Sequence, residues 1–151
     1  MKVSMYDFFE QTAKENKDKT AVIENGQTWT FGQLERDCHG IAAQIIEKSG
    51  MTNSVIGVLL KKSYSLIAAD LAITASGCAY MNLDYKSPSE RIRSIINNVK
   101  PTLIITDAQG AGLLSSISGE IVPQLIVLGS DKIEAPVHSS AASFRRHRQN
   151  V

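Results

Sequence analysis

The chain has 151 residues and a formal net charge of +1, with 21% charged and 43% hydrophobic residues. This length corresponds to one domain that can bury about 70% of the surface of its unfolded chain. Its charges are interspersed and nearly balanced, which excludes the electrostatic field that attracts nucleic acids, membrane surfaces and acidic substrates. We therefore expect neither a nucleic-acid partner nor a membrane partner.

The N-terminus and the cysteines indicate the compartment. Residues 1–7 lack the apolar run and the small-residue cleavage site of a signal peptide. The longest apolar stretch, 66–73, is short for a membrane span and contains Asp70. Cys38 and Cys78 are too few for a disulfide framework, and each lies in an apolar run. We expect buried free thiols in a reducing cytoplasm.

The first thirty residues predict a helix and a hairpin. Residues 6–15 have the spacing of an amphipathic helix. Its regularly spaced apolar residues are Phe8, Phe9 and Ala13. Residues 20–24 and 27–30 are typical strands that flank Asn25-Gly26, a strong hairpin signal because both turn positions need positive φ.

A second helix follows the hairpin directly. Thr30 and Gln33 have the spacing of a capping box, which begins a helix, and Gly50 ends it. Thr30 and Gln33 are explained by this start of a helix, so no catalytic role is needed for either residue. One apolar stripe runs along this helix: Leu34, Cys38, Ile41, Ala42, Ile45 and Ile46.

From residue 55 onward, apolar strands alternate with helices. The predicted strands are 55–60, 78–83, 103–106 and 124–128, and the predicted helices are 64–75, 88–99 and 108–117. In the helix 88–99, the residues expected to face inward are Ile92, Ile95, Ile96 and Val99. Pro101 blocks the continuation of that helix. The pattern predicts an α/β fold, a parallel sheet with helices on both faces, preceded by a helix and a β-hairpin.

The stretch 77–92 contains the most distinctive motif. Ser87 followed by Pro88 and then Glu90 predicts a capping box at the start of a helix. The stretch also resembles a signature of adenylate-forming (AMP-binding) enzymes, most closely the adenylation domains of nonribosomal peptide synthetases. That pattern runs Gly-x-Ala-Tyr-Val-Pro-Leu-Asp, a short turn with a proline, then Glu-Arg-Ile. The matching residues are Gly77, Ala79, Tyr80, Leu83, Asp84, Pro88, Glu90, Arg91 and Ile92, and the departures are Asn82, Tyr85 and Ser87.

A second motif lies upstream at the interval that the family has. Residues 29–34, Trp-Thr-Phe-Gly-Gln-Leu, are similar to its Leu-Thr-Tyr-x-Glu-Leu element. The resemblance implies that residues 1–130 are part of the N-terminal subdomain of an adenylation domain, and we expect residues 131–151 to be a disordered or weakly packed tail. It implies that the complete enzyme activates an amino acid or other carboxylic acid with ATP and magnesium to an acyl-adenylate, for transfer to a carrier-protein thiol. D-alanyl carrier-protein ligases and acyl-CoA synthetases are near alternatives.

The triphosphate loop of that family is missing from this sequence. The family has a Gly/Ser/Thr-rich loop with lysines, whereas the nearest candidate, 110–114, has no lysine after it. We interpret 110–114 as a flexible, poor helix. Because the loop and the catalytic lysine are absent, we expect this chain alone to be inactive. We assign it no catalytic, cofactor-binding or metal-binding residue and expect it to bind no cofactor.

Other chemically suggestive residues have structural explanations. Cys38 and His39 are adjacent on a helix and point about 100° apart, so they make a poor catalytic dyad. His138 and His147 have no partners at metal-ligand spacing. The arginines of the tail are best explained as solvated charges.

The acidic candidates are interpreted in the same way. Asp84 and Asp107 follow predicted strands, where α/β sheets bind ligands, but capping or turn roles are favoured. Asp70, inside a predicted buried helix, is expected to pair with Lys61 or Lys62, or to lie on a polar edge.

Two functional alternatives follow. One is a non-catalytic interaction module that pairs with itself or with a synthetase or carrier partner, since so few helices leave apolar surface exposed. The other, an unrelated nucleotide-binding α/β protein, is weakened by the lack of a phosphate loop. For an adenylation-domain part, the expected partners are the remainder of the ligase, a carrier protein or a second copy.

Overall fold

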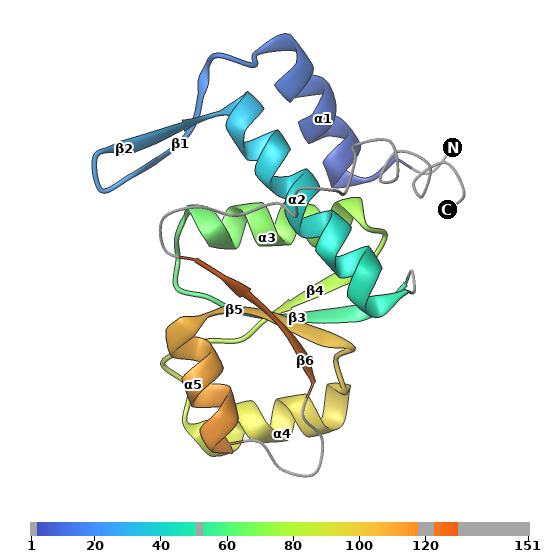
Figure 1. The fold of residues 1–151 in the computed structure, drawn as a ribbon, viewed down its shortest axis with the longest axis vertical. Coiled ribbons are helices and arrows are strands. Elements are labelled where there is room, and N and C mark those ends of the chain that lie inside the picture. Colours follow the sequence, from blue (N-terminus) through green and yellow to red (C-terminus); the bar gives the residue numbers. More distant parts are fainter. Residues whose placement is uncertain (1–2, 51–52, 118–122, 130–151) are drawn as a thin grey trace.

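The computed structural model describes residues 3–50, 53–117 and 123–129, and the predicted tail 131–151 lies outside them. The helices and strands follow one another along the chain as in Figure 1. In order they are α1 (Met5–Glu15), β1 (Thr20–Glu24), β2 (Gln27–Thr30), α2 (Phe31–Ser49), β3 (Val55–Leu59), α3 (Tyr64–Ala75), β4 (Ala79–Asn82), α4 (Ser89–Val99), β5 (Leu103–Asp107), α5 (Ala108–Ile117) and β6 (Gln124–Leu128).

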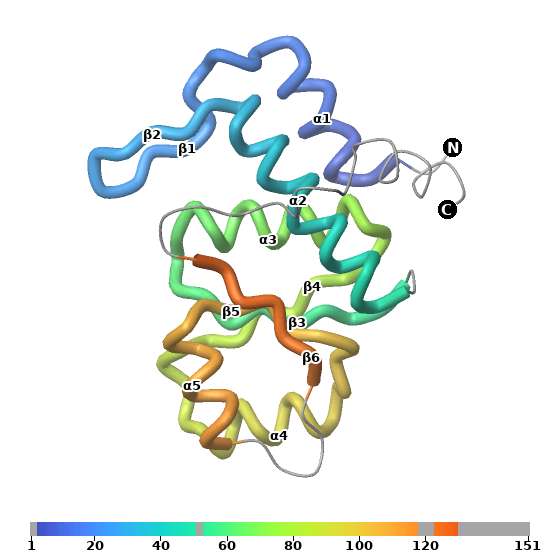
Figure 2. Tube along the Cα trace, in the orientation of Figure 1, coloured from blue at the N-terminus to red at the C-terminus, as the bar shows by residue number. Residues whose placement is uncertain are grey.

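The alternating second part forms the predicted parallel sheet. Within the described ranges, four strands pair in the order β4-β3-β5-β6, and every pair is parallel. Strands β1 and β2 form a separate antiparallel hairpin that projects from α2 in the trace of Figure 2. The prediction of an α/β fold preceded by a helix and a hairpin is confirmed.

Helices cover both faces of this sheet, as predicted. In Figure 1, α2 and α3 lie on one side, with α1 beyond them, while α4 and α5 lie on the other. Each face has its own apolar core. Among the fully buried side chains of the first core are Ile41, Ile45, Ile56, Ile73 and Ile105. Those of the second are Leu59, Ile92 and Ile104.

The turn and cap signals in the N-terminal part are confirmed. Asn25 and Gly26 both have positive φ, at 48° and 79°, as their type of hairpin turn requires. The Thr30 side chain accepts from the Gln33 N–H, and the Gln33 side chain accepts from the Thr30 N–H, which completes the box that begins α2. Gly50 ends that helix in the left-handed conformation.

The predicted Ser87–Glu90 box is wrong. Helix α4 begins one residue later, with Pro88 still extended (ψ 143°) at the N-cap and no side-chain cap hydrogen bond. The preceding loop explains the shift, because Asp84 Oδ1 accepts from the Lys86 N–H and Asp84 O accepts from the Ser87 N–H. A box does occur at α1, where Ser4 and Asp7 cap each other, and the sequence interpretation missed it.

Three predictions of burial fail at the periphery. Phe8 on α1 is 66% exposed and Val99 on α4 is 41% exposed, so neither helix buries the full stripe expected of it. Strand β4 is exposed along most of its length because it is an edge strand of the sheet rather than a covered one. Helix α3, by contrast, is largely buried, as its nearly all-round apolar sequence predicts.

Candidate functional site

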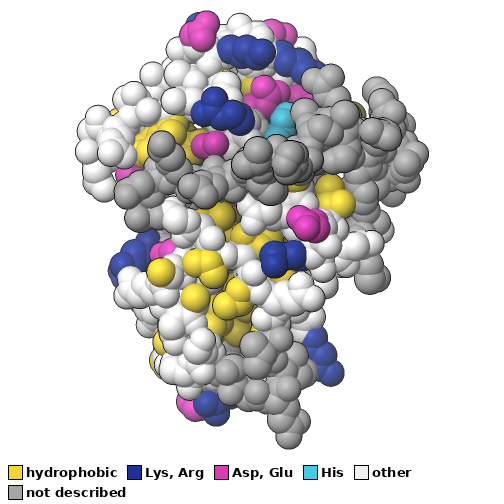
Figure 3. Space-filling model, viewed as in Figure 1, with side chains coloured by type: hydrophobic (Ala, Val, Ile, Leu, Met, Phe, Trp, Pro, Cys, Tyr) yellow, Lys and Arg dark blue, Asp and Glu magenta, His cyan; other side chains and the backbone are white. Residues whose placement is uncertain are grey.

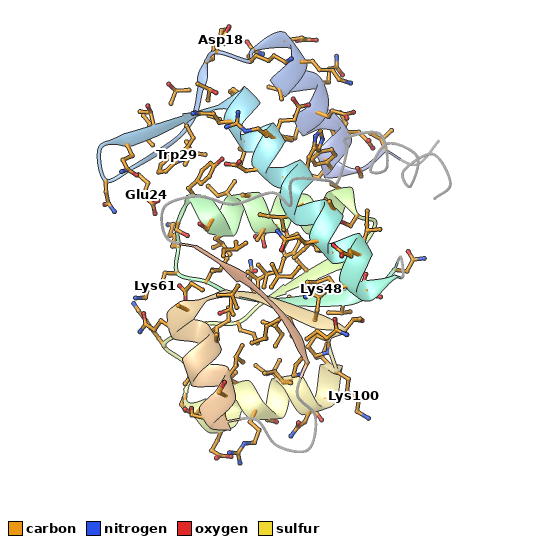
Figure 4. All side chains as sticks on the ribbon, viewed as in Figure 1. Asp18, Glu24, Trp29, Lys48, Lys61 and Lys100 are labelled. Atoms are coloured by element: carbon orange, nitrogen blue, oxygen red, sulfur yellow. The ribbon has the colours of Figure 1, made fainter. Side chains whose placement is uncertain are left out.

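The sheet has a topological switch point between its two central strands. Strands β3 and β5 are neighbours, yet α3 follows β3 on one face and α5 follows β5 on the other. In open α/β sheets, ligands bind outside the carboxyl ends of the strands at such a point. The segments after β3, β4 and β5 carry polar side chains there, and Figure 4 shows Lys61 at the end of the sheet where α5 begins.

A hydrogen-bond network occupies this carboxyl edge. Tyr85 Oη donates to Asp107 Oδ1 at 2.5 Å, and the Gly110 N–H donates to the same oxygen at 2.7 Å. Beneath them, the buried Thr106 hydroxyl donates to Leu59 O at 2.8 Å. The loop after β4 is thus fixed to the start of α5, and β5 is fixed to the end of β3.

Gly110 allows this network to close. An alanine Cβ at this position would lie 1.9 Å from Thr106 Oγ1 and 2.6 Å from Tyr85 Oη, well inside van der Waals contact. Gly110 lies in α5, as the predicted helix 108–117 expects, and its missing side chain leaves room for Thr106 Oγ1 and Tyr85 Oη. Gly112 has no atom within 4 Å of such a Cβ.

Lys61 supplies a positive charge beside the network. Its ammonium donates to Gln109 Oε1 at 2.8 Å and lies 5.7 Å from the centre of the Tyr85 ring. Both Lys61 and Gln109 are exposed, so this contact is weakly constrained. The lysine lies beside a tyrosine ring and an amide, and it follows no glycine-rich turn.

Tyr85 acts here as a hydrogen-bond donor. Burial, the hydrogen bond to Asp107 and the charge of that carboxylate raise the pKa of Tyr85 to about 12. The phenol therefore keeps its proton throughout the physiological range and continues to donate to Asp107. Its role is to hold the loop after β4 against the junction of β5 and α5.

The two acidic candidates have the cap and turn roles that were favoured. Asp107 caps α5 through the Gly110 N–H, and Asp84 accepts from the Lys86 N–H at 2.9 Å. The structure brings Asp107 together with Tyr85 and leaves Asp84 outside the network. Sequence reasoning missed Tyr85, although its departure from the family pattern marked the position.

Cys38 and His39 have different partners. The Cys38 thiol is fully buried and donates to Ala68 O at 3.6 Å, and burial raises its pKa above the ordinary value of a thiol. The ring of His39 lies 6.3 Å from that of Tyr6 on α1. Cys38 is the buried thiol predicted, whereas Cys78 is only half-buried. His138 and His147 lie outside the described residues.

Asp70 pairs with neither Lys61 nor Lys62. Its Oδ2 accepts from Asn82 Nδ2 at 3.1 Å, beside the edge strand β4, so the alternative of a polar edge is confirmed. Burial raises the pKa of this carboxyl. Asn82 replaces the proline that the family pattern has at this position, and the structure explains it as a partner of Asp70.

One cluster of ligand-type side chains escaped the sequence interpretation entirely. Glu10, Glu35 and His39 offer atoms that all lie within 4.8 Å of one another. The four-residue spacing of Glu35 and His39 was visible, but the third member comes from another helix.

Among the described helices, none is long and apolar enough to cross a bilayer.

Comparison with known proteins gives the family. Residues 9–149 match the family described as AMP-binding enzyme. Malpinin synthetase of Mortierella alpina is 30% identical over 126 residues, which cover 83% of this chain and 2% of that protein. Tyrocidine synthase 1 of Brevibacillus parabrevis is 28% identical over 134 residues, 87% of this chain and 12% of that protein. The chain thus spans a small part of these relatives.

Solved structures share the fold. The nonribosomal peptide synthetase FmoA3 has a TM-score of 0.77 at 22% identity, covering 89% of this chain and 14% of that one. The four-domain synthetase holo-AB3403 has a TM-score of 0.77 at 22% identity, and the match covers 97% of this chain and 10% of that one. Together with the family match, these similarities confirm the resemblance predicted from residues 77–92 and 29–34. The chain belongs to the AMP-binding enzyme family and corresponds to the N-terminal part of an adenylation domain of the nonribosomal peptide synthetase type.

Proposed function

We propose that residues 1–130 are a scaffold part of an adenylation domain. The complete domain activates an amino acid or other carboxylic acid with ATP and magnesium to an acyl-adenylate and passes the acyl group to a carrier-protein thiol. Two similar structures support the nucleotide, because FmoA3 has been solved with AMPPNP bound and holo-AB3403 with AMP and glycine bound. The partners are then the remainder of the ligase and a carrier protein.

The carboxyl-edge network is the observation that carries this proposal. At the switch point, Asp107 accepts hydrogen bonds from the Tyr85 hydroxyl and the Gly110 N–H. The Thr106 hydroxyl donates to Leu59 O on the neighbouring strand β3. Asp107 already accepts from the Gly110 N–H, so this N–H is not available to a phosphate oxygen. ATP and magnesium are then held by segments outside this chain, and the chain alone is inactive and holds no catalytic residue.

The scaffold function is tested by ATP–pyrophosphate exchange. The purified 151-residue chain should show no exchange that depends on a carboxylic acid, because the charge-stabilising groups of the transition state are missing. In a chimera, this chain replaces the matching segment of tyrocidine synthase 1, and exchange should appear. The recipient without any segment in that place is the control. Robust exchange by the chain alone, free of contaminating synthetase, would refute the proposal, as would a folded but inactive chimera.

A second candidate is the non-catalytic interaction module. The outer strands of the described sheet favour it, since Tyr80 on β4 and Val127 on β6 are both exposed. Exposed apolar side chains on edge strands are suited to pairing with another chain. The chimera experiment distinguishes the two functions, because a scaffold part supports ATP–pyrophosphate exchange and a dedicated interaction module does not.

A further inference from the structure

Three side chains suited to metal binding meet where α1 packs against α2. A carboxylate oxygen of Glu10, one of Glu35 and a ring nitrogen of His39 all lie within 4.8 Å of one another. All three side chains are partly buried, so they are neither free surface charges nor locked in the core. Figure 3 shows a histidine beside acidic side chains on the surface above the sheet.

The two helices hold these side chains in a common orientation. Glu35 and His39 are four residues apart on α2, so their side chains lie one turn apart on the same face. Glu10 comes from α1, and Tyr6, four residues before it, has its ring 6.3 Å from the ring of His39. The imidazole is thus positioned against one face of α1 by an aromatic neighbour, with Glu10 one turn further along that face.

The donor set favours a particular class of metal. An imidazole nitrogen with carboxylate oxygens suits zinc and its first-row neighbours, whereas calcium and magnesium prefer oxygen ligands alone. In a tetrahedral zinc site with bonds of about 2.1 Å, neighbouring ligand atoms are about 3.4 Å apart. Small side-chain rotations would bring atoms now within 4.8 Å to that spacing.

The local charge also fits a divalent cation. Lys14 pairs with Glu10 at 3.5 Å, but its side chain is 59% exposed, against 25% for Glu10. An exposed lysine can turn toward solvent at little cost in free energy. One ammonium in any case supplies a single charge beside two carboxylates.

We propose that Glu10, Glu35 and His39 form a site for a divalent first-row transition metal, zinc above all, with water completing the coordination. The metal fixes α1 to α2. Since α1 makes its packing contacts with α2 and α3, binding stabilises the N-terminal helix layer without entering the sheet or its carboxyl edge.

The experiment titrates the full metal-free chain with cobalt(II), whose visible spectrum reports nitrogen and oxygen ligation, and then displaces cobalt with zinc. One equivalent should bind, and zinc should raise the thermal unfolding midpoint. Glu35→Gln and Glu10→Gln keep the side-chain shape and should each weaken cobalt binding at least tenfold. Glu47→Gln, the same change at an exposed position of α2, should leave the affinity unchanged.

A double variant, His138→Asn with His147→Asn, separates this site from the tail histidines. It should bind cobalt as the unchanged chain does, whereas His39→Gln should not. The proposal is overturned if the unchanged chain binds no cobalt at micromolar concentration. It is equally overturned if the tail double variant loses binding, or if Glu35→Gln binds as tightly as Glu47→Gln.

Discussion

Replacing Gly110 with alanine tests the close approach of α5 to β5. In an exposed helix this change stabilises by up to about 1 kcal/mol, because alanine has the higher helix propensity. Here the new Cβ would lie 1.9 Å from Thr106 Oγ1, where ordinary contact begins at 3.4 Å. Thr106 is fully buried and bonded to Leu59 O, so it cannot move without losing that bond.

The expected cost follows from two terms that the helix propensity only partly offsets. Overpacking costs about 1–3 kcal/mol, and leaving Leu59 O without its partner costs about 1–3 kcal/mol. After the gain in helix propensity of up to about 1 kcal/mol is allowed for, we expect Gly110→Ala to lower the free energy of unfolding by about 1–5 kcal/mol. The thermal midpoint should then fall by roughly 10 °C.

Urea denaturation followed by circular dichroism measures the effect, with Gly112→Ala as the matched control. That alanine meets no atom within 4 Å, so it should stabilise the protein by about 0.5–1 kcal/mol. The double variant Gly110→Ala with Thr106→Ala should lose at least about 1 kcal/mol less free energy of unfolding than the two single variants lose together. Equal effects of alanine at the two glycines would refute the reasoning.

Two further predictions concern a cap and a tyrosine. Thr30→Ala should lower the free energy of unfolding by about 1 kcal/mol, because it removes a formed capping box. Ser87→Ala should change it by less than about 0.5 kcal/mol, since Ser87 caps nothing; equal urea midpoints for the two variants would contradict this. Tyr85→Phe should cost about 1 kcal/mol near neutral pH by removing the hydrogen bond to Asp107. Folding raises the pKa of Tyr85 to about 12, so this stabilisation is fully present below pH about 10 and is lost as the pH rises toward 12. Chemical denaturation at several pH values should therefore show the gap between Tyr85→Phe and the unchanged protein narrowing above pH 10, and a gap independent of pH would show that the phenol makes no such bond.

Sequence reasoning predicted the candidate site only in part. It placed Asp84 and Asp107 after strands and favoured cap or turn roles for them, because a carboxylate at a strand end satisfies nearby N–H groups by local geometry. It could not assign Tyr85 to Asp107, since the two are separated by 22 residues and meet only when β5 and the loop after β4 reach the same end of the sheet. The Ser87 box failed for a related reason: a turn at Asp84, with its own hydrogen bonds, delayed the start of α4.

The sequence by itself determined the local structure of this protein. Asn25-Gly26 specifies a turn, Thr30 with Gln33 begins a helix, and continuous apolar runs specify covered strands, because each signal acts within a few residues. The tertiary structure alone decided the strand order β4-β3-β5-β6, which places β4 at an edge and exposes it. It also decided that Gly110 must lack a side chain and that Glu10 joins Glu35 and His39. These contacts join residues distant along the chain, so no local pattern of spacing can encode them, and packing of the helices on the sheet creates them.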